Sequence, residues 1–171
     1  MKKILLLVLC VVLCLSFAGC VQENVPSKET TNIESEVEKI ETVFGLNEVA
    51  VFKTLKFTAL EMKESYGDSF FEPKDGNTFV GVKFEVENVS DEEQIVSSIL
   101  LFEGYSDDVK CEYSFNAACA FDDGTIDGTI APGKKLIGWY ALEVPTNWQE
   151  IELHVQSNWL SNNAAKFIFK K

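Results

Sequence analysis

Strict alternation of apolar and polar residues in one segment limits what this chain can fold into. Val80, Val82, Phe84 and Val86 are apolar, and the residues at 83, 85 and 87 are charged. A period of two places the apolar side chains on one face of a β-strand and the charged ones on the other. The segment therefore predicts an antiparallel strand with one buried face, which must pack against a second layer.

Similar short apolar segments recur along the chain, separated by turn residues such as those of Lys74–Asn77 and Pro132-Gly133. Pro-Gly suits a type II turn, and Pro145, which cannot donate to a ladder, should end a strand. From residue 43 onward no helical period exceeds ten residues. Seven or eight short strands separated by such turns predict an all-β antiparallel sandwich. The predicted strands are Val49 to Phe52, Leu55 to Met62, Val80 to Val86, Ile95 to Phe102, Val109 to Phe115, Leu136 to Val144, Ile151 to Val155 and Lys166 to Phe169.

The first nineteen residues have the pattern of an export signal. A basic start at Lys2 and Lys3 precedes an apolar run over 4–18, which is shorter than the roughly 20 residues that span a bilayer. The run ends in small residues directly before Cys20, which resembles the lipobox of prokaryotic lipoproteins. The resemblance implies cleavage behind Gly19 and a diacylglyceryl group on the Cys20 sulfur. An uncleaved anchor helix or an ordinary signal peptide remain the alternatives, and each leaves the rest of the chain outside the cytoplasm.

These features divide the chain into a signal peptide (1–19), a lipid-anchored polar linker (20–42) and a folded domain (43–171). Between residues 21 and 42 the chain carries six glutamates, two lysines and no aromatic residue. Ile33, Val37 and Ile40 would share one face of a short helix. A flexible linker of this length spans a root-mean-square distance of about 25 Å.

The chain is strongly acidic and contains no arginine. Its 27 aspartate and glutamate residues outnumber its 15 lysines, which gives a net charge of −12. Removal of residues 1–19 takes away two lysines and no acidic residue, which lowers the charge to −14. Because nucleic acids are bound mainly through their phosphates, this composition excludes a nucleic-acid partner. It also disfavours adsorption to anionic lipids, so we expect membrane association through the acyl chains on Cys20, with the body held away from the surface.

Two blocks of the domain resemble a large family of small prokaryotic lipoproteins. The first is Gly76-Asn77-Thr78-Phe79-Val80-Gly81-Val82-Lys83-Phe84-Glu85-Val86-Glu87-Asn88, and the second runs from Gly128 through Pro132-Gly133 and Gly138 to Pro145. The family carries a telokin-like domain of unknown function. The resemblance covers about residues 46–171 and implies an immunoglobulin-like sandwich on an exported lipoprotein. It implies no activity and no catalytic residues.

The sequence offers few groups for catalysis. His154, the single histidine, alternates with Ile151, Leu153 and Val155 and should face outward beside Glu152. No second histidine is present for a metal pair or a proton relay, and no Ser-x-x-Lys or Gly-x-Ser-x-Gly motif occurs. We therefore expect no enzyme activity, no catalytic residue and no cofactor.

Cysteine and aspartate residues suggest two further sites. Cys111 and Cys119 could form a disulfide outside the cytoplasm, and the alternative is a pair of buried thiols. Asp122, Asp123 and Asp127 lie beside a glycine turn, but the set is too small for the six to eight oxygens that calcium takes. We therefore predict no metal site and keep calcium as a minor alternative.

Three other residues remain open on sequence alone. Asn88 opens an Asn-Val-Ser sequon, which matters only in a host that glycosylates. Trp148 and Trp159 lie around the last strands, where we expect them in the core. If both were exposed together, they would be the best candidate for an interaction site.

Together these observations predict a non-enzymatic, lipid-anchored domain on the extracytoplasmic face of the cell membrane. It would bind an unknown protein or ligand outside the cytoplasm. One alternative is a carrier of a small apolar ligand, which would show a cavity between the sheets. The other is an unrecognised hydrolase, which would show a perturbed, buried carboxylate or lysine near a nucleophile.

Overall fold

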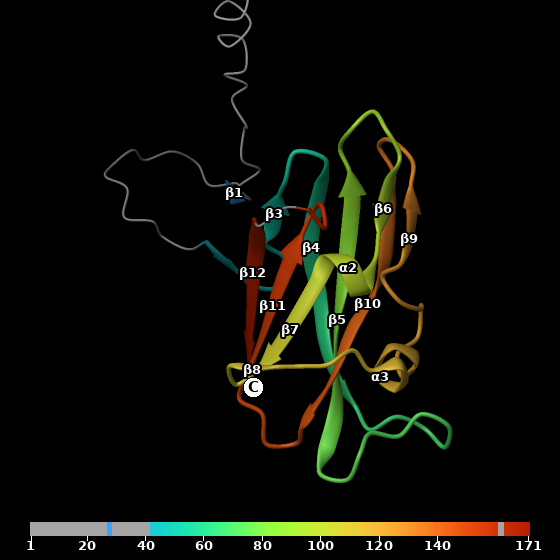
Figure 1. Ribbon diagram of the computed structural model, residues 1–171, viewed down its shortest axis with the longest axis vertical. Helices are drawn as coiled ribbons and strands as arrows, with labels where there is room; N and C mark the ends of the chain where they lie inside the picture. The colour runs from blue at the N-terminus through green and yellow to red at the C-terminus, as the bar shows by residue number, and fades with distance from the viewer. Residues whose placement is uncertain (1–26, 29–41, 161–162) are drawn as a thin grey trace, which may run out of the picture.

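The computed structural model describes residues 27–28, 42–160 and 163–171, and two five-stranded sheets pack face to face in it (Figure 1). The predicted antiparallel β-sandwich is confirmed. The first sheet has the order β1 (Ser27–Lys28), β3 (Val49–Val51), β4 (Leu55–Ser65), β5 (Asn77–Asn88) and β10 (Lys135–Pro145). The second has the order β2 (Val43–Phe44), β12 (Ala164–Lys170), β11 (Glu150–Gln156), β7 (Phe102–Ser106) and β8 (Val109–Lys110).

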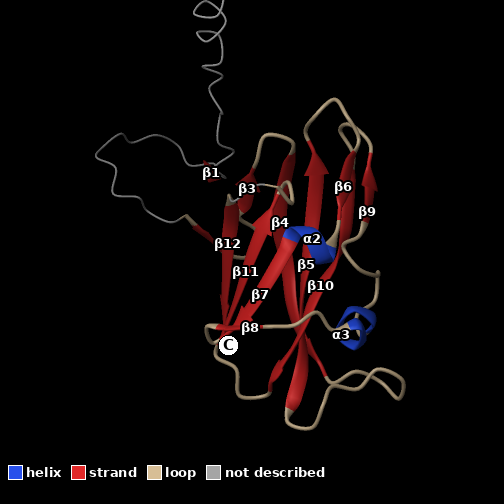
Figure 2. Cartoon of the chain, viewed as in Figure 1, coloured by secondary structure: helices blue, strands red, loops and turns tan. Residues whose placement is uncertain are grey.

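Smaller elements complete the described chain (Figure 2). β6 (Gln94–Val96) and β9 (Gly128–Ile130) form a two-stranded sheet, and α2 (Ser98–Leu101) and α3 (Phe115–Cys119) are short helices. Strand pairing is antiparallel throughout the named strands except between β2 and β12.

Aromatic side chains fill the space between the two sheets. The ring of Phe84, on β5, lies 5.3 Å from the rings of Phe102 and Phe167, which belong to the second sheet. Phe102 also stacks on Tyr140 at 4.9 Å and meets Phe57 edge-on at 6.0 Å. Each of these residues is buried. This packing explains why the alternating apolar positions of β5 point inward, as the sequence predicts.

The expected strand from Ile95 to Phe102 is wrong, because a helical turn interrupts it. β6 ends at Val96, α2 occupies 98–101, and β7 begins only at Phe102. The Asp127 carboxylate accepts hydrogen bonds from the backbone N–H and the hydroxyl of Ser98 at 2.7 to 3.1 Å. This contact, made across 29 residues, holds a turn that the local apolar run does not predict.

The expected strand from Val109 to Phe115 is also shorter than predicted. β8 covers Val109–Lys110 only, and Phe115 opens α3. The Ser114 hydroxyl accepts a hydrogen bond from the Ala117 N–H at 3.2 Å, which caps the first turn of the helix. Serine is a preferred N-cap residue, so a local signal for this helix is present.

The predicted turns at Pro132-Gly133 and Pro145 are confirmed. Gly133 has φ +69°, and the Lys134 N–H donates to the Ala131 carbonyl at 3.1 Å, as a type II turn requires. β10 ends at Pro145.

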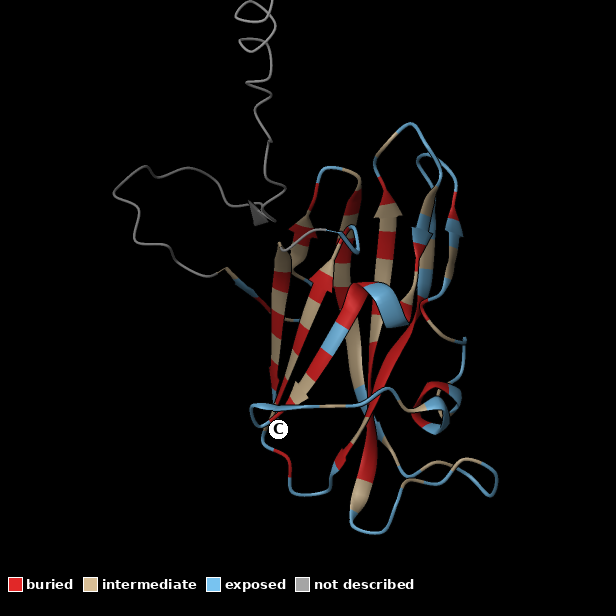
Figure 3. Cartoon of the chain, viewed as in Figure 1, coloured by how far each residue is buried: buried red, intermediate tan, exposed pale blue. Residues whose placement is uncertain are grey.

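The two sheets differ in how their outer faces are treated. On β11 and β12 buried and less buried residues alternate, so the outer face of the second sheet is open (Figure 3). On β5, residues 78–82 are all buried, and on β10 residues 138–142 are all buried. This part of the outer face of the first sheet is covered by α3 and the segment that follows it, where Phe79, Ala117 and Ala141 form a second small core with Phe121 packed against it.

Candidate functional site

Exposed aromatic residues lie on two segments, the β4–β5 loop and the chain around the start of α3, which approach each other at one end of the sandwich (Figure 1). The aromatic residues of these segments, here called the aromatic tip, are Tyr66, Phe70, Phe71, Tyr113 and Phe115. Four of them are exposed, and the Phe70 side chain reaches 84% exposure. The Phe71 and Phe115 rings meet edge-on at 6.1 Å, so the two segments contact each other.

The turn that carries Phe70 is held by its own hydrogen bonds. The Asp68 Oδ1 accepts from the backbone N–H groups of Phe70 at 2.8 Å and Phe71 at 3.0 Å, and these bonds lower the pKa of the Asp68 carboxyl. Gly67 has φ +73°, and a Cβ there would lie 1.7 Å from the Phe71 carbonyl oxygen. Only glycine fits such a position. The turn therefore presents Phe70 to solvent from a defined backbone.

A groove of about 340 Å³ adjoins the aromatic tip, and Tyr113 and Phe115 belong to its lining. Glu143 organises its polar side, accepting hydrogen bonds from Asn77 Nδ2 at 2.9 Å, the Lys74 N–H at 3.0 Å and the Ser114 hydroxyl at 3.4 Å. Partial burial acts to raise the pKa of the Glu143 carboxyl, but these bonds outweigh it and the pKa is lowered. The carboxylate is therefore stabilised in its charged form. The lining residues are Lys74, Asn77, Glu112, Tyr113, Ser114, Phe115, Asn116 and Glu143.

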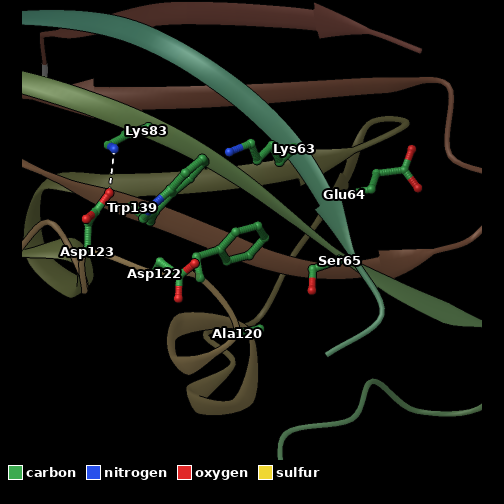
Figure 4. Close-up of a pocket in the computed structure, with 9 residues that line it drawn as sticks. Lys63, Glu64, Ser65, Lys83, Ala120, Asp122, Asp123 and Trp139 are labelled. Carbon is green, nitrogen blue, oxygen red and sulfur yellow. Dashed lines mark hydrogen bonds and ion pairs between the residues drawn. The ribbon is translucent and has the colours of Figure 1, made fainter. Parts of the chain in front are cut away.

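A second groove, of about 300 Å³, lies on the outer face of the first sheet (Figure 4). Its centre is Trp139, which is buried. The Phe121 ring stacks on the indole at 4.9 Å, and the Lys63 and Lys83 Nζ atoms lie 5.5 and 5.6 Å from the indole centroid. Gly81 leaves the room that the Phe121 ring occupies, since a Cβ there would lie 2.7 Å from it.

The lysines of this groove already have carboxylate partners. Lys83 Nζ lies 2.6 Å from Asp123 Oδ2, and Lys63 Nζ lies 2.9 Å from Glu61 Oε1. The hydrogen bond between Lys83 and Asp123 raises the pKa of the lysine and lowers that of the aspartate. These pairs form a balanced surface network, which does not favour a site for a small anion.

The acidic residues singled out in the sequence do not form a metal cage. Asp123 pairs with Lys83, and Asp127 binds Ser98. Across the described ranges, no group of three or more histidine, cysteine, aspartate or glutamate side chains is arranged to hold an ion. Asp122 lines the groove around Trp139, where it lies in the loop that faces the sheet (Figure 4).

His154 lies on the open outer face of the second sheet, as predicted. Its Nε2 lies 2.5 Å from Glu152 Oε1, and its ring lies 5.1 Å from that of Tyr105. Lys166 Nζ lies 3.3 Å from the same Glu152 oxygen. Partial burial acts to raise the pKa of the Glu152 carboxyl, but the bonds from His154 and Lys166 lower it overall. The group is a polar network on a sheet surface.

Cys111 and Cys119 are both free thiols in the structure. Cys111 packs against the main core, and burial raises the pKa of its thiol. Cys119 is exposed at the end of α3. The disulfide between them stays a prediction.

Asn88 is a structural residue rather than an accessible acceptor for sugar. Its side chain is fully buried, and its Nδ2 donates to the carbonyls of Glu92 at 2.7 Å and Ile130 at 2.8 Å. Its Oδ1 accepts from the Ser90 N–H and hydroxyl. One amide hydrogen thus ties the end of β5 to β9, and the other ties it to the loop between β5 and β6.

The two tryptophans predicted in the core have different positions. Trp148 is buried, as expected, whereas Trp159 is 64% exposed in the β11–β12 loop, so the prediction for Trp159 is wrong. They do not form a joint exposed patch. The signal peptide, Cys20 and the apolar stripe of Ile33, Val37 and Ile40 lie outside the described residues. Among the helices in the described part of the chain, none has the length and hydropathy to cross a membrane.

Sequence reasoning missed the aromatic tip. A signal for it was present, because Phe70-Phe71 stands between Gly67-Asp68-Ser69 and Glu72-Pro73, where turn residues exclude a buried strand. The contact with Phe115 carries no local signal, since that residue lies 44 positions further along the chain.

The two packed sheets define a β-sandwich protein, and the comparisons agree. Residues 44–166 match the model of DUF4352, a domain of unknown function, and the chain belongs to this family. No curated protein matches the chain at a significant level.

Three solved structures share the fold. One is a "putative lipoprotein (ycdA)" of Bacillus subtilis subsp. subtilis str. 168, with a TM-score of 0.54 and 14% identity; the match covers 68% of this chain and 36% of that chain. The second is an uncharacterized beta-sandwich protein of Clostridium difficile 630, with a TM-score of 0.51 and 15% identity over 81% of this chain and 99% of that one. The third is a conserved hypothetical protein of Bacillus anthracis, with a TM-score of 0.50 and 15% identity over 72% and 94%. At these identities the likeness concerns the fold alone.

Proposed function

We propose that this chain is a lipid-anchored domain on the extracytoplasmic face of the cell membrane, and that it binds a partner protein through the aromatic tip without catalysing a reaction. The N-terminal pattern ending at Cys20 supports the anchor. The description of the Bacillus subtilis structure as a "putative lipoprotein" supports it further. The telokin-like, immunoglobulin-like assignment belongs to the same proposal.

One observation carries the binding role: four exposed aromatic side chains on one end of the sandwich. Aromatic residues dominate the energetics of protein interfaces, and large exposed apolar patches on a soluble domain mark interaction sites. The hydrogen bonds around Asp68 fix the turn before any partner arrives, which reduces the entropy lost on binding.

The surroundings of the aromatic tip indicate the chemistry of the partner. Lys74 is the basic residue of the two tip segments (66–76 and 111–115), and the acidic ones outnumber it. These are Asp68, Glu72, Asp75 and Glu112, with Glu143 at the adjoining groove. A complementary surface has an apolar centre bordered by lysine or arginine. The partner is therefore a protein with a basic rim around an apolar patch.

The other two functions receive less support. A carrier would need room between the sheets, but aromatic rings in mutual contact occupy that space. Both grooves described above lie outside the sandwich interior. A hydrolase would need a perturbed group near a nucleophile. Among the described residues, the pKa of Tyr140 is strongly raised, and burial in the core is the main cause.

Anchoring is tested with the full chain expressed in a bacterium that processes lipoproteins. We expect the mature protein to begin at Cys20, to carry the mass of the acyl chains and to enter the detergent phase on phase separation. The variant Cys20→Ala should lose the added mass and stay out of that phase. The same mass and partition for both chains would contradict the anchor.

Binding is tested with benzoylphenylalanine in place of Phe70 in the same full-length, cell-bound chain. Irradiation should yield an adduct with one protein. The yield should fall as salt rises, because opposite charges surround the apolar contact. The matched control places the same group at Ile95, which is 73% exposed on β6, and should give no such adduct. Equal adducts at both sites, or none at Phe70, would overturn the proposed interface.

A further inference from the structure

The edge strand β1 fixes where the linker leaves the folded domain. β1 pairs antiparallel with β3, with Ser27 opposite Val51 and Lys28 opposite Ala50. Val51 is the last residue of β3, so Ser27, the first residue of β1, lies at the end of the sheet where the β3–β4 turn is. Two residues of the predicted linker thus belong to the first sheet.

This pairing shortens the distance over which the body can move from its anchor. Six residues (21–26), rather than the whole linker, separate Cys20 from Ser27. The seven Cα–Cα steps between these two residues extend to at most about 25 Å, and as a flexible coil they span about 15 Å. If the chain is lipid-anchored as proposed above, the end of the sandwich near the β3–β4 turn stays close to the bilayer, contrary to the expectation from the charge alone that the body is held away from it.

The β11–β12 loop lies at this same end of the molecule (Figure 1). Residues 157–163 contain no charged side chain, although the mature chain carries a net charge of −14. Trp159 and Leu160 stand next to each other there and are 64% and 70% exposed. The Leu160 N–H donates to Asn158 Oδ1 at 2.9 Å, which shapes the turn that presents them.

We propose that Trp159 and Leu160 insert into the lipid–water interface of the membrane that holds the Cys20 acyl chains. Tryptophan favours this interface because its ring is apolar and its N–H can bond to water or headgroups. The uncharged loop avoids the repulsion that the acidic body meets at anionic headgroups. This second contact orients the body, so that the aromatic tip, at the other end of the sandwich, points away from the membrane.

The inference rests on the proposed anchor and is tested with the same mature, acylated chain in phosphatidylcholine vesicles. Bromine on the acyl chains, near the headgroups, quenches tryptophan at the interface. We expect brominated vesicles to quench the wild-type emission by about a third relative to ordinary vesicles, since one of three tryptophans is in contact. Trp159→Phe should abolish this quenching, because the remaining Trp139 and Trp148 are buried.

Further variants separate insertion from a change in fold. Leu160→Asn keeps all three tryptophans and should lower the quenching by at least half, whereas Ile95→Asn, an equally exposed apolar site on β6, should leave it unchanged. Anchored protein with equal quenching in wild type and Trp159→Phe would overturn the insertion and leave the anchor standing. A chain that lacks acyl mass and does not bind the vesicles would overturn both proposals.

Discussion

The outer faces of the two sheets differ, because that of the second sheet is exposed and that of the first is partly buried. On the second sheet, Glu152, His154 and Lys166 form a polar network at the surface, and the buried residues point only inward. On the first sheet, Phe79 and Trp139 point outward and are nevertheless buried, because α3 and the Phe121 segment cover them. The second sheet is thus packed on one side, and the first is packed on both sides where residues 78–82 of β5 and 138–142 of β10 lie.

This difference shows where the domain has stability and where it is free to carry function. A sheet buried on both faces gains apolar contact from a second layer, as in sheets covered by helices. The helix α3, which covers part of the first sheet, begins at Phe115. Phe115 and the nearby Tyr113 also belong to the aromatic tip. The presentation of that surface therefore depends on the second small core.

Among the variants, Phe79→Ala on the covered face should have the largest effect on the unfolding free energy. Phe79 is fully buried against Ala117 and Ala141, and truncation of a buried phenylalanine costs about 3–5 kcal/mol of unfolding free energy. Tyr105→Ala, on the open face, should cost about 1 kcal/mol or less, as for a surface cross-strand neighbour. Urea unfolding of both variants measures the difference. Equal losses would mean that α3 does not provide a second core.

A smaller effect is expected at Gly81, where the cover approaches the sheet most closely. A Cβ there would lie 2.7 Å from the Phe121 ring, so Gly81→Ala should cost about 1–3 kcal/mol by overpacking. In a Phe121→Ala background the same change should cost nothing, because the obstructing ring is gone. A double-mutant cycle by urea unfolding should therefore give a coupling of about 1 kcal/mol or more. Independent effects would show that the ring does not rest on Gly81.

The inward face of β5 could be predicted from the sequence because its signal is local. Val80, Val82 and Phe84 alternate with period two, and the structure places all three in the main core. The covered face also has a signal in the sequence, since Phe79 and Trp139 occupy outward positions within continuous apolar runs. What covers them could not be predicted, because it depends on α3, which packs from a distant part of the chain.

Apart from the strand predicted over Val109 to Phe115, where the N-cap Ser114 is a local signal, the remaining errors have the same origin. The helical turn α2 replaces a predicted strand because Asp127, far along the chain, binds Ser98. Of the candidate site, the exposure of Phe70 could have been inferred from the turn residues around it. The contact of Phe71 with Phe115, and the exposure of Trp159, required the tertiary arrangement of the loops.

The smallest expected effect belongs to the open face and depends on pH. The pKa of Glu152 is lowered in the folded state, so its ion network stabilises the protein above the ordinary glutamate pKa, about 4.3, and this contribution is lost as the pH falls through the lower folded-state value. Glu152→Gln should therefore lower the unfolding free energy by about 0.5–1 kcal/mol at neutral pH, as for a partly exposed ion pair. Below the folded-state pKa of Glu152, the unfolding free energies of the wild type and Glu152→Gln should converge. Lys166→Met, which removes one donor to the carboxylate, should lower the unfolding free energy at neutral pH by part of the same amount. Urea unfolding at neutral and acidic pH measures both gaps, and a Glu152→Gln gap that stays constant with pH would show that the open face contributes by packing, as the covered face does.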